Sequence, residues 1–222
     1  MELAGLLGIQ PGITAVIGGG GKTTLLRTLG LELAQGHRVV LCTTTKILPF
    51  PDLPCAMTRA DLQDMRETHH LLCAGTLVPQ TGKLMAPEVS METLAAWFDY
   101  VLVEADGAAR RPLKAHAPHE PVIPPQANQT ICVVGSSGFG RPIAQAAHRP
   151  ERYARLAGVS IDAPATPETE AAVLLAEGLH DRVFVNQVET EEELKLARLL
   201  ADRMGCPVLA GALQKGAYVE CR

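Results

Sequence analysis

Short apolar runs alternate along the chain with segments in which apolar residues recur every three or four positions. The runs have the length of β-strands, and the recurring pattern is typical of helices that bury one face. Strands are predicted at residues 13–17, 38–43, 100–103, 130–135, 182–185 and 207–210. Helices are predicted near the start of the chain, after the first strand as far as Gly36, and at residues 58–67, 87–98, 148–156, 166–178 and 190–201.

This alternation predicts an α/β fold. The strands at 13–17 and 38–43 are joined by one helix and a short return loop, which implies a right-handed crossover and parallel pairing. Both strands are apolar throughout, as expected when helices cover both faces of a sheet. We therefore expect a three-layer, P-loop NTPase-like fold with a mostly parallel central sheet flanked by helices. The length suits a single domain over residues 1–222, with a small β insertion around 47–86.

Composition restricts the classes of partner. Apolar residues make up 47% of the chain and charged residues 20%, and the mean hydropathy of +0.11 is that of a globular protein. A net charge of −4 gives no general attraction to nucleic acid or to an acidic membrane, so neither is expected as a partner. The first residues lack the basic and apolar regions of a secretory signal, and we expect a cytoplasmic protein. The six cysteines include no C-x-x-C pair, which indicates neither a zinc site nor a disulfide framework.

A block of glycines separates the first strand from a helix that begins with Lys-Thr-Thr. Glycine lets backbone N–H groups approach phosphate oxygens closely, and the start of the helix adds its positive end. The ammonium of Lys22 would reach the β- and γ-phosphates of a nucleotide, and the hydroxyl of Thr23 would hold Mg²⁺. The sequence therefore predicts a site for ATP or GTP with Mg²⁺. Its residues are Gly18, Gly19, Gly20, Gly21, Lys22, Thr23 and Thr24.

The match to the phosphate-loop pattern G-x-x-x-x-G-K-[ST] covers its second half only, because Val16 stands where the first glycine is usual. One alternative is a tight glycine-rich turn in an α/β protein. Another is the dinucleotide fingerprint G-x-G-x-x-G counted from Gly18, which would need a glycine where Thr23 stands. The Lys-Thr-Thr at the helix start favours the triphosphate interpretation.

A second apolar strand ends in acidic residues, Glu104 and Asp106, followed by Gly107. A carboxylate at such a strand tip holds Mg²⁺ directly or through water, so Thr23, Glu104 and Asp106 are the predicted metal ligands. With Lys22, the two acids are also the predicted catalytic residues. Gly107 is spaced like the glycine of a D-x-x-G switch, whose N–H meets the γ-phosphate. The alternative is a plain turn.

The strand at 38–43 ends in Thr-Thr-Thr-Lys at 43–46. Ligands of parallel α/β sheets lie at the carboxyl ends of strands, so Thr44 and Lys46 are expected to face the γ-phosphate, Mg²⁺ or a second substrate. A strand end with a capping hydroxyl is the alternative.

A later strand ends in Asn186-Gln187-Val188-Glu189. Its position and spacing resemble the N-K-x-D base-recognition signature of GTPases, with Gln187 in place of Lys and Glu189 in place of Asp. Asn186 is expected to belong to the nucleotide site, and a carboxylate at 189 would pair with a guanine edge. Because the Lys of the signature is missing, the choice between ATP and GTP stays open.

The densest basic segment of the chain follows the acidic strand and is interrupted by prolines, which hold it extended and stiff. Such a segment suits an anionic second substrate or an acidic patch on a partner. A solvated Pro-rich loop is the alternative. The residues predicted to contact the substrate or partner are Arg110, Arg111, Lys114, His119 and Glu120.

Taken together, these segments resemble the YqeC family, whose members are accessory proteins for selenium-dependent molybdenum hydroxylases. The resemblance spans nearly the whole chain, and its most specific part is 104–124. The residues that carry it are Gly-Gly-Lys-Thr-Thr at 20–24, Thr-Thr-Thr-Lys at 43–46, Glu-Ala-Asp-Gly-Ala at 104–108, Arg-Pro-Leu-Lys-Ala at 111–115, His-Glu-Pro-Val-Ile-Pro at 119–124 and His-Arg-Pro-Glu at 148–151.

The resemblance implies a nucleotide-driven step, by an Mg²⁺-dependent nucleoside triphosphatase, that helps install selenium or the molybdenum cofactor in a hydroxylase. The hydroxylase or its cofactor would be the partner, and the phosphate of the pterin cofactor suits the segment at 110–120. Two other functions stay open. One is a small-molecule kinase or ATP-dependent ligase acting on an anionic substrate, and the other is a nucleotide sensor without catalysis.

Overall fold

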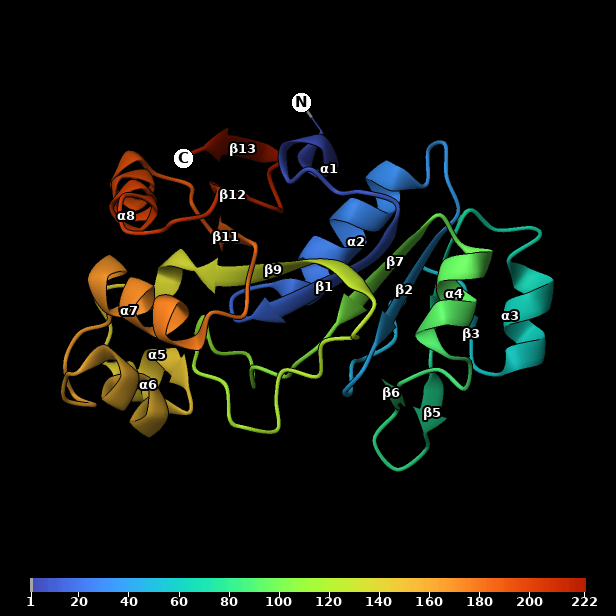
Figure 1. Ribbon diagram of the computed structural model, residues 1–222, viewed down its shortest axis with the longest axis horizontal. Coiled ribbons are helices and arrows are strands. Elements are labelled where there is room, and N and C mark those ends of the chain that lie inside the picture. Colours follow the sequence, from blue (N-terminus) through green and yellow to red (C-terminus); the bar gives the residue numbers. More distant parts are fainter. Residues whose placement is uncertain (1) are drawn as a thin grey trace. The chain divides into compact units, whose positions relative to one another are not determined.

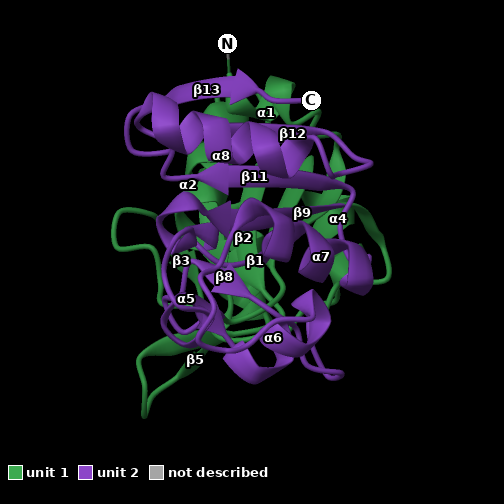
Figure 2. Ribbon diagram, turned by 90° about the vertical axis from the view of Figure 1, so that its left-hand side faces the viewer, with its two compact units in different colours: residues 1–16, 23–107, 122–129 green, residues 17–22, 108–121, 130–222 purple. Residues whose placement is uncertain are grey.

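The computed structural model describes residues 2–222. Their contacts divide the chain into two compact units, which Figure 2 colours separately. The first unit comprises the residues up to 16 together with 23–107 and 122–129. The second comprises 17–22, 108–121 and 130–222. Each unit is therefore assembled from segments that lie far apart in the sequence.

The first unit is built on parallel strands that pair in the order β1-β7-β2-β4-β3 (Figure 1). Glu104, the last residue of β7, is the register partner of Val16 in β1 and of Thr43 in β2. The carboxyl ends of these three strands therefore reach the same level. The bounds are β1 (Gly12–Gly18), β7 (Tyr100–Glu104), β2 (Val39–Thr43), β4 (Leu71–Ala74) and β3 (Cys55–Ala56).

Helices cover both faces of this sheet. Val40 of β2 packs in one buried cluster with Leu62 of α3 and Leu94 of α4. Leu41, whose side chain points to the opposite face, lies against α2, where a Cβ built on Gly30 would be 3.0 Å from it. The bounds are α1 (Leu3–Leu6), α2 (Lys22–Leu33), α3 (Arg59–Met65) and α4 (Met91–Trp97), and a separate antiparallel hairpin consists of β5 (Thr76–Val78) and β6 (Lys83–Met85).

The second unit contains its own series of parallel strands, β9, β11 and β12, and an antiparallel edge strand, β13. Strand β13 is not among the predicted elements, because its side chains are half-buried or exposed and its pairing with β12 is what makes it a strand. The bounds are β9 (Ala127–Gly135), β11 (Arg182–Asn186), β12 (Val208–Ala212) and β13 (Ala217–Glu220).

The helices of the second unit begin where the sequence offers capping residues. Thr166 and Thr190 each form a capping box, and Pro150 and Pro167 occupy first-turn positions. The elements are the 3-10 helix η1 (Ser136–Gly138), α5 (Ile143–Ala146), α6 (Pro150–Ala157), α7 (Pro167–Glu177) and α8 (Glu191–Ala201), with the short parallel strands β8 (Leu113–Lys114) and β10 (Ala147–His148).

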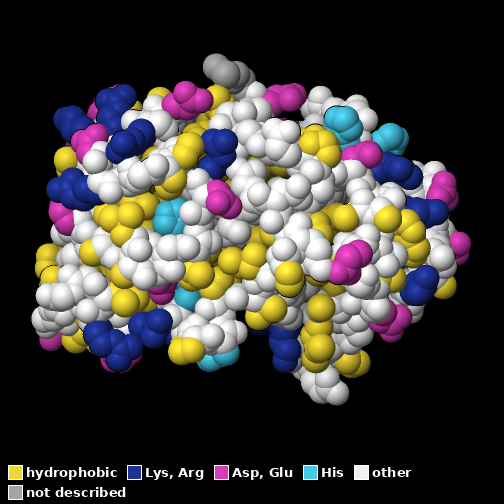
Figure 3. All heavy atoms as spheres, viewed as in Figure 1, with side chains coloured by type: hydrophobic (Ala, Val, Ile, Leu, Met, Phe, Trp, Pro, Cys, Tyr) yellow, Lys and Arg dark blue, Asp and Glu magenta, His cyan; other side chains and the backbone are white. Residues whose placement is uncertain are grey.

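The predicted fold class is confirmed: the protein has a mixed α/β structure with a large, mostly parallel sheet flanked by helices. Val16 belongs to β1, as expected, but the strand continues to Gly18, so the first residue of the predicted glycine loop closes the strand. Lys and Arg side chains are interspersed with Asp and Glu side chains over the face drawn in Figure 3. Over residues 2–222, no helix combines the length and the apolar character needed to cross a membrane.

Candidate functional site

A hydroxyl and a carboxylate meet at the carboxyl end of β7 in the first unit. The hydroxyl of Thr23 donates a hydrogen bond of 2.8 Å to Oε2 of Glu104. Strand β7 is buried along its whole length, and Glu104 is only 7% exposed, whereas Thr23 is exposed. The pair is therefore held by a rigid strand on one side and opens to solvent on the other.

The end of β2 supports the backbone of Glu104. The hydroxyl of Thr43 donates to the carbonyl oxygen of Glu104 at 2.8 Å, and the N–H of Thr44 donates to the same oxygen at 3.2 Å. The hydroxyl of Thr44 donates to the carbonyl of Val122 at 2.7 Å. Lys46 is exposed. Two of the three threonines of the 43–46 segment thus fix the acidic strand tip.

The other two predicted site residues that follow β7, Asp106 and Gly107, differ in exposure. Asp106 is fully buried, and Gly107 is exposed. A Cβ built on Gly107 would meet no atom within 4 Å.

In the second unit, the glycine loop is packed closely against backbone. The N–H of Gly19 donates to the carbonyl of Val133 at 2.8 Å, and the N–H of Gly20 donates to that of Arg111 at 3.1 Å. Gly20 has φ +72°, and a Cβ on it would lie 2.4 Å from the Cα of Gly135. Only glycine fits such a close backbone approach in this conformation. The loop is therefore a fixed turn that cannot carry a larger residue at this position.

Lys22 folds back over this loop. Its Nζ donates to the carbonyl of Gly18 at 2.6 Å, and the residue is 5% exposed. Lys22, Thr23 and Thr24 form the first turn of α2, where N–H groups have no helical acceptor and point along the helix axis. An ammonium and a helix start at the end of a glycine turn are the groups that bind phosphate oxygens.

Asn186 connects the glycine loop to the rest of the second unit. Its Nδ2 donates to the carbonyl of Gly20 at 2.7 Å, and its Oδ1 accepts the N–H of Leu213 at 3.2 Å. The side chain is buried, so both of its polar atoms are used to position backbone. The predicted nucleotide residues Gly20 and Asn186 are therefore in direct contact.

The pair Thr23 and Glu104 of the first unit offers oxygens of the kind that fit Mg²⁺. Mg²⁺ binds oxygen ligands, commonly one or two carboxylates together with phosphates and water. Thr23 and Glu104 supply two such oxygens. Within 2–222, no cluster of three or more His, Cys, Asp or Glu residues is arranged to hold a metal by itself. An Mg²⁺ at Glu104 would take its remaining oxygens from water or phosphate.

The predicted substrate segment divides into exposed and buried members. Arg110, Arg111 and His119 are exposed, and the guanidinium of Arg111 donates to the carbonyl of Gln145. Arg110 has φ +60°, which is strained for a residue with a side chain.

Lys114, which is buried, and Glu120, which is half-buried, instead form an ion-pair network with the half-buried Arg149. The Nζ of Lys114 is 3.2 Å from Glu120, and Nε of Arg149 is 2.7 Å from it. Burial of Glu120 opposes its ionisation, but the hydrogen bond from Arg149 and the charge of Lys114 outweigh burial and lower the pKa of this carboxyl to about 2. This network fixes the segment, so a ligand would meet its exposed arginines and His119.

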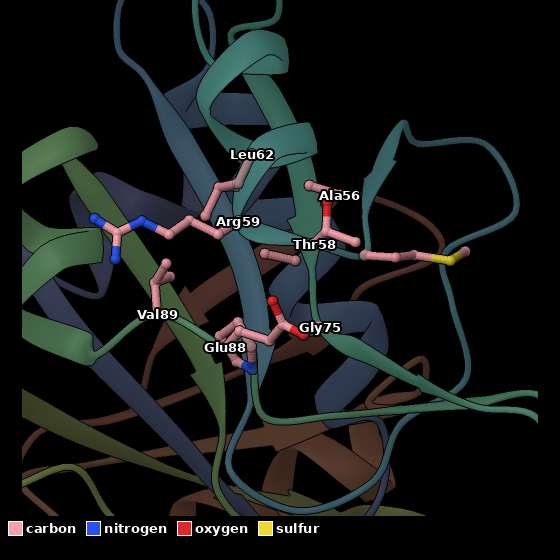
Figure 4. Close-up of a pocket in the computed structure, with 10 residues that line it drawn as sticks. Ala56, Thr58, Arg59, Leu62, Gly75, Glu88 and Val89 are labelled. Atoms are coloured by element: carbon pink, nitrogen blue, oxygen red, sulfur yellow. The ribbon is translucent and has the colours of Figure 1, made fainter.

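A separate small pocket lies in the first unit at the carboxyl ends of β3 and β4 (Figure 4). It contains about 180 Å³ of space, part of it open to solvent, and Thr58 and Glu88 line it. The Arg59 guanidinium points away from the pocket and lies 5.8 Å from the centroid of the Trp97 ring. The residues lining the pocket are all outside the set predicted from the sequence, so this pocket is distinct from the candidate nucleotide site.

Three residues of the site region were not predicted as such from the sequence. Thr43 lies in the Thr-Thr-Thr-Lys segment at 43–46, and Arg149 lies in His-Arg-Pro-Glu at 148–151. Because both segments carry the family resemblance, the sequence could have indicated both residues. Lys215 lies beyond the carboxyl end of β12 and pairs with Glu189 at 2.5 Å. Its signal was its position after a strand end, where ligands of parallel sheets bind.

Comparison with known proteins extends these observations. The family model described as YqeC protein matches residues 14–151, more than half of the chain and including the glycine loop and the acidic strand tip. A protein of Escherichia coli (strain K12), named "Uncharacterized protein YqeC", is 34% identical over 163 residues, which is 69% of this chain. The alignment spans 64% of that relative's length, so the chain matches just under two thirds of it. The chain belongs to the YqeC family.

Proposed function

We propose that this protein binds and hydrolyses a nucleoside triphosphate with Mg²⁺, and that this step assists the maturation of a selenium-dependent molybdenum hydroxylase. The observation that carries the proposal is the 2.8 Å hydrogen bond between Thr23 and Glu104. In P-loop NTPases, Mg²⁺ is held by the Ser or Thr after the loop lysine and by an acid at a strand tip. The two residues here have these chemical types and are already in contact.

Each residue has a defined task in this proposal. The first turn of α2 and the ammonium of Lys22 bind the β- and γ-phosphates, and the next residue, Thr23, shares Mg²⁺ with Glu104. Asp106 and the N–H of Gly107 position the γ-phosphate or the attacking water. Mg²⁺ neutralises charge on the phosphates when it is bound. The exposed Arg110, Arg111 and His119 are the groups available to the partner or its anionic cofactor.

Calorimetric titration of ATP and GTP, with and without Mg²⁺, tests nucleotide binding. Lys22→Ala should weaken binding of the preferred triphosphate by about tenfold or more, because it removes a charged donor. Thr23→Val should abolish the gain in affinity that Mg²⁺ gives, whereas Thr23→Ser, which keeps the hydroxyl, should retain it. Lys195→Ala, at an exposed position in α8, is the matched control and should bind like wild type. If Lys22→Ala binds the triphosphate as tightly as wild type does, the proposal is wrong.

The maturation role has its own test. Hydrolysis should be slow in the protein alone and should rise when a cofactor-free molybdenum hydroxylase is added. Rapid transfer of phosphate to a small anionic molecule would instead identify a kinase or ligase. Tight binding without turnover under either condition would identify a sensor.

A further inference from the structure

The loops that follow β11 and β12 meet at one buried amide. Asn186 ends β11, and its side chain bonds both the carbonyl of Gly20 and the N–H of Leu213, the residue after β12. Because β11 and β12 are parallel, their carboxyl ends lie at the same edge. All of these residues belong to the second unit. One side chain therefore ties the glycine loop to both strand-end loops.

The side chain of Asn186 can lie against the glycine loop only because Gly21 has no side chain. Gly21 has φ +126°, and a Cβ on it would lie 2.5 Å from Nδ2 of Asn186. A polyphosphate bound on the loop would thus lie beside the loops after β11 and β12. In parallel α/β sheets the remainder of a ligand extends across the carboxyl ends of neighbouring strands. The nucleoside would therefore lie over these two loops.

Each of the two loops carries one charged residue, and the two charges are paired. Nζ of Lys215 lies 2.5 Å from Oε2 of Glu189, and the side chains are 59% and 43% exposed. Backbone bonds fix both loops, since the N–H of Val188 donates to the carbonyl of Gly211 at 3.0 Å and that of Lys215 to Ala212 at 2.9 Å. Exposed ion pairs contribute little to folding stability, so this pair is free to serve a ligand without cost to the fold.

Gln187 stands in the position of the Lys of N-K-x-D, but it bonds the two serines of η1. Its φ is +66°, its carbonyl accepts the hydroxyl of Ser136 at 2.6 Å, and its Oε1 accepts that of Ser137 at 2.6 Å. Ser137 thus fixes the side chain of Gln187, which is exposed, at the start of η1. The neighbouring loop supplies an ammonium from Lys215 instead.

A carboxylate beside an ammonium complements guanine. Guanine presents N–H donors at N1 and N2 next to an acceptor at O6, which match an acceptor-only carboxylate and a donor-only ammonium. Adenine presents an acceptor at N1, which would face the carboxylate, and a donor at N6, which would face the ammonium. The same pair therefore attracts one purine and repels the other.

We propose that Glu189 and Lys215 bind the guanine base and make this protein selective for guanine nucleotides. This inference rests on the proposed function, because it requires the polyphosphate to lie on the glycine loop.

Calorimetric titration of the full chain in Mg²⁺ with GTP, ITP, XTP and ATP tests it. Wild type should bind GTP at least tenfold more tightly than ATP, with ITP between them because it lacks the N2 amine. Glu189→Gln should lose about tenfold for GTP, improve ATP because the carboxylate no longer faces adenine N1, and improve XTP, whose O2 accepts the new amide donor. Glu192→Gln, at an exposed acid in the first turn of α8, is the matched control and should behave as wild type.

The outcomes separate the two proposals. Equal binding of ATP and GTP, or an equal loss of both in Glu189→Gln, would overturn guanine selectivity and leave the proposed function standing. Absence of binding by every triphosphate would overturn both. Thermal melting of each variant checks that it is folded, and the exposed position of residue 189 makes loss of folding unexpected.

Discussion

At the scale of single residues, a hydrogen bond between two thiols shifts their pKa values in opposite directions. Cys55 and Cys73 are register partners in the parallel strands β3 and β4, whose spacing brings their side chains together on one face. The hydrogen bond from Cys73 lowers the pKa of Cys55, and burial only partly opposes this. The same bond, together with burial, raises the pKa of Cys73. Burial alone raises the pKa of Cys42 to about 12.

Cys55 should therefore be the most reactive cysteine. Iodoacetamide at pH 8, followed by peptide mass spectrometry over time, should label Cys55 first, because the thiolate is the nucleophile. Cys206 and Cys221 are equally accessible but have a raised pKa, and they serve as internal controls. Cys73→Ala should slow the labelling of Cys55 severalfold. Labelling of Cys55 no faster than that of the two controls would contradict this explanation.

At the scale of elements, helix starts could be predicted where the signal is local. The helices predicted at 166–178 and 190–201 begin at the residues that cap α7 and α8, Thr166 and Thr190, because the residues that bond to these caps lie three positions away. The start of α4 was predicted four residues too early, since Pro87-Glu88 imitates a first helical turn. Ser90, whose hydroxyl accepts the N–H of Thr93 at 3.3 Å, is the actual cap.

The cap of α7 gives an element-scale prediction. Thr166→Ala removes the acceptor for the N–H of Thr169 and should lower the free energy of unfolding by about 1 kcal/mol. Urea denaturation monitored by circular dichroism measures this change. Thr166→Ser keeps the hydroxyl and should be close to wild type. If alanine and serine destabilise the protein equally, the loss comes from the threonine methyl group and the cap is unimportant.

In the candidate site, too, the features that could be predicted are those formed by residues close together in the sequence. The glycine loop, Lys22 and Thr23 are one continuous segment, so their chemistry could be read from the sequence. The contact of Thr23 with Glu104 and that of Asn186 with Gly20 join residues 81 and 166 positions apart, and no local pattern encodes such distances. The ion pair of Glu120 with Arg149 likewise joins residues 29 positions apart. The residue types were predictable and their pairings were not.

At the scale of the whole molecule, the chain divides into two compact units, and no change in amino-acid composition indicates where one ends and the other begins. Residues 17–22 and 108–121 belong to the second unit, although the segments around them belong to the first. The predicted single domain over 1–222, with an insertion around 47–86, stays a prediction. Burial is likewise not marked by composition, since Glu170 is a charged residue of α7 and yet is only 2% exposed.

Glu170 should make stability depend on pH. Burial raises the pKa of its carboxyl to about 8, and the charge of Glu177 adds to this, against a hydrogen bond from Tyr153 and the charge of His116. Between an unfolded pKa near 4.5 and about 8, the unfolded chain has released a proton that the folded protein keeps. Rising pH therefore favours unfolding across this window and has no further effect through this group above it.

Glu170→Gln should remove this dependence. Its melting temperature should match wild type near pH 4.5 and exceed it by several degrees at pH 8, because each pKa unit corresponds to about 1.4 kcal/mol. Scanning fluorimetry from pH 4.5 to 9 measures the difference, with Glu168→Gln, an exposed acid in the same helix, as the control. A constant difference between Glu170→Gln and wild type at all pH values would show that Glu170 is ionised in the folded protein.

The bond from Lys22 to Gly18 has a consequence for how an anion is captured. A phosphate that takes the ammonium must displace a carbonyl oxygen already bonded to it, so the enthalpy released is the difference between two bonds. The ammonium also bridges the glycine turn, because the carbonyl that it bonds belongs to Gly18, the last residue before the turn. Lys22→Ala would then lose both the bridging bond and the charge, whereas Lys22→Gln, which keeps N–H donors on a side chain one bond shorter, would lose the charge and retain part of the bridge.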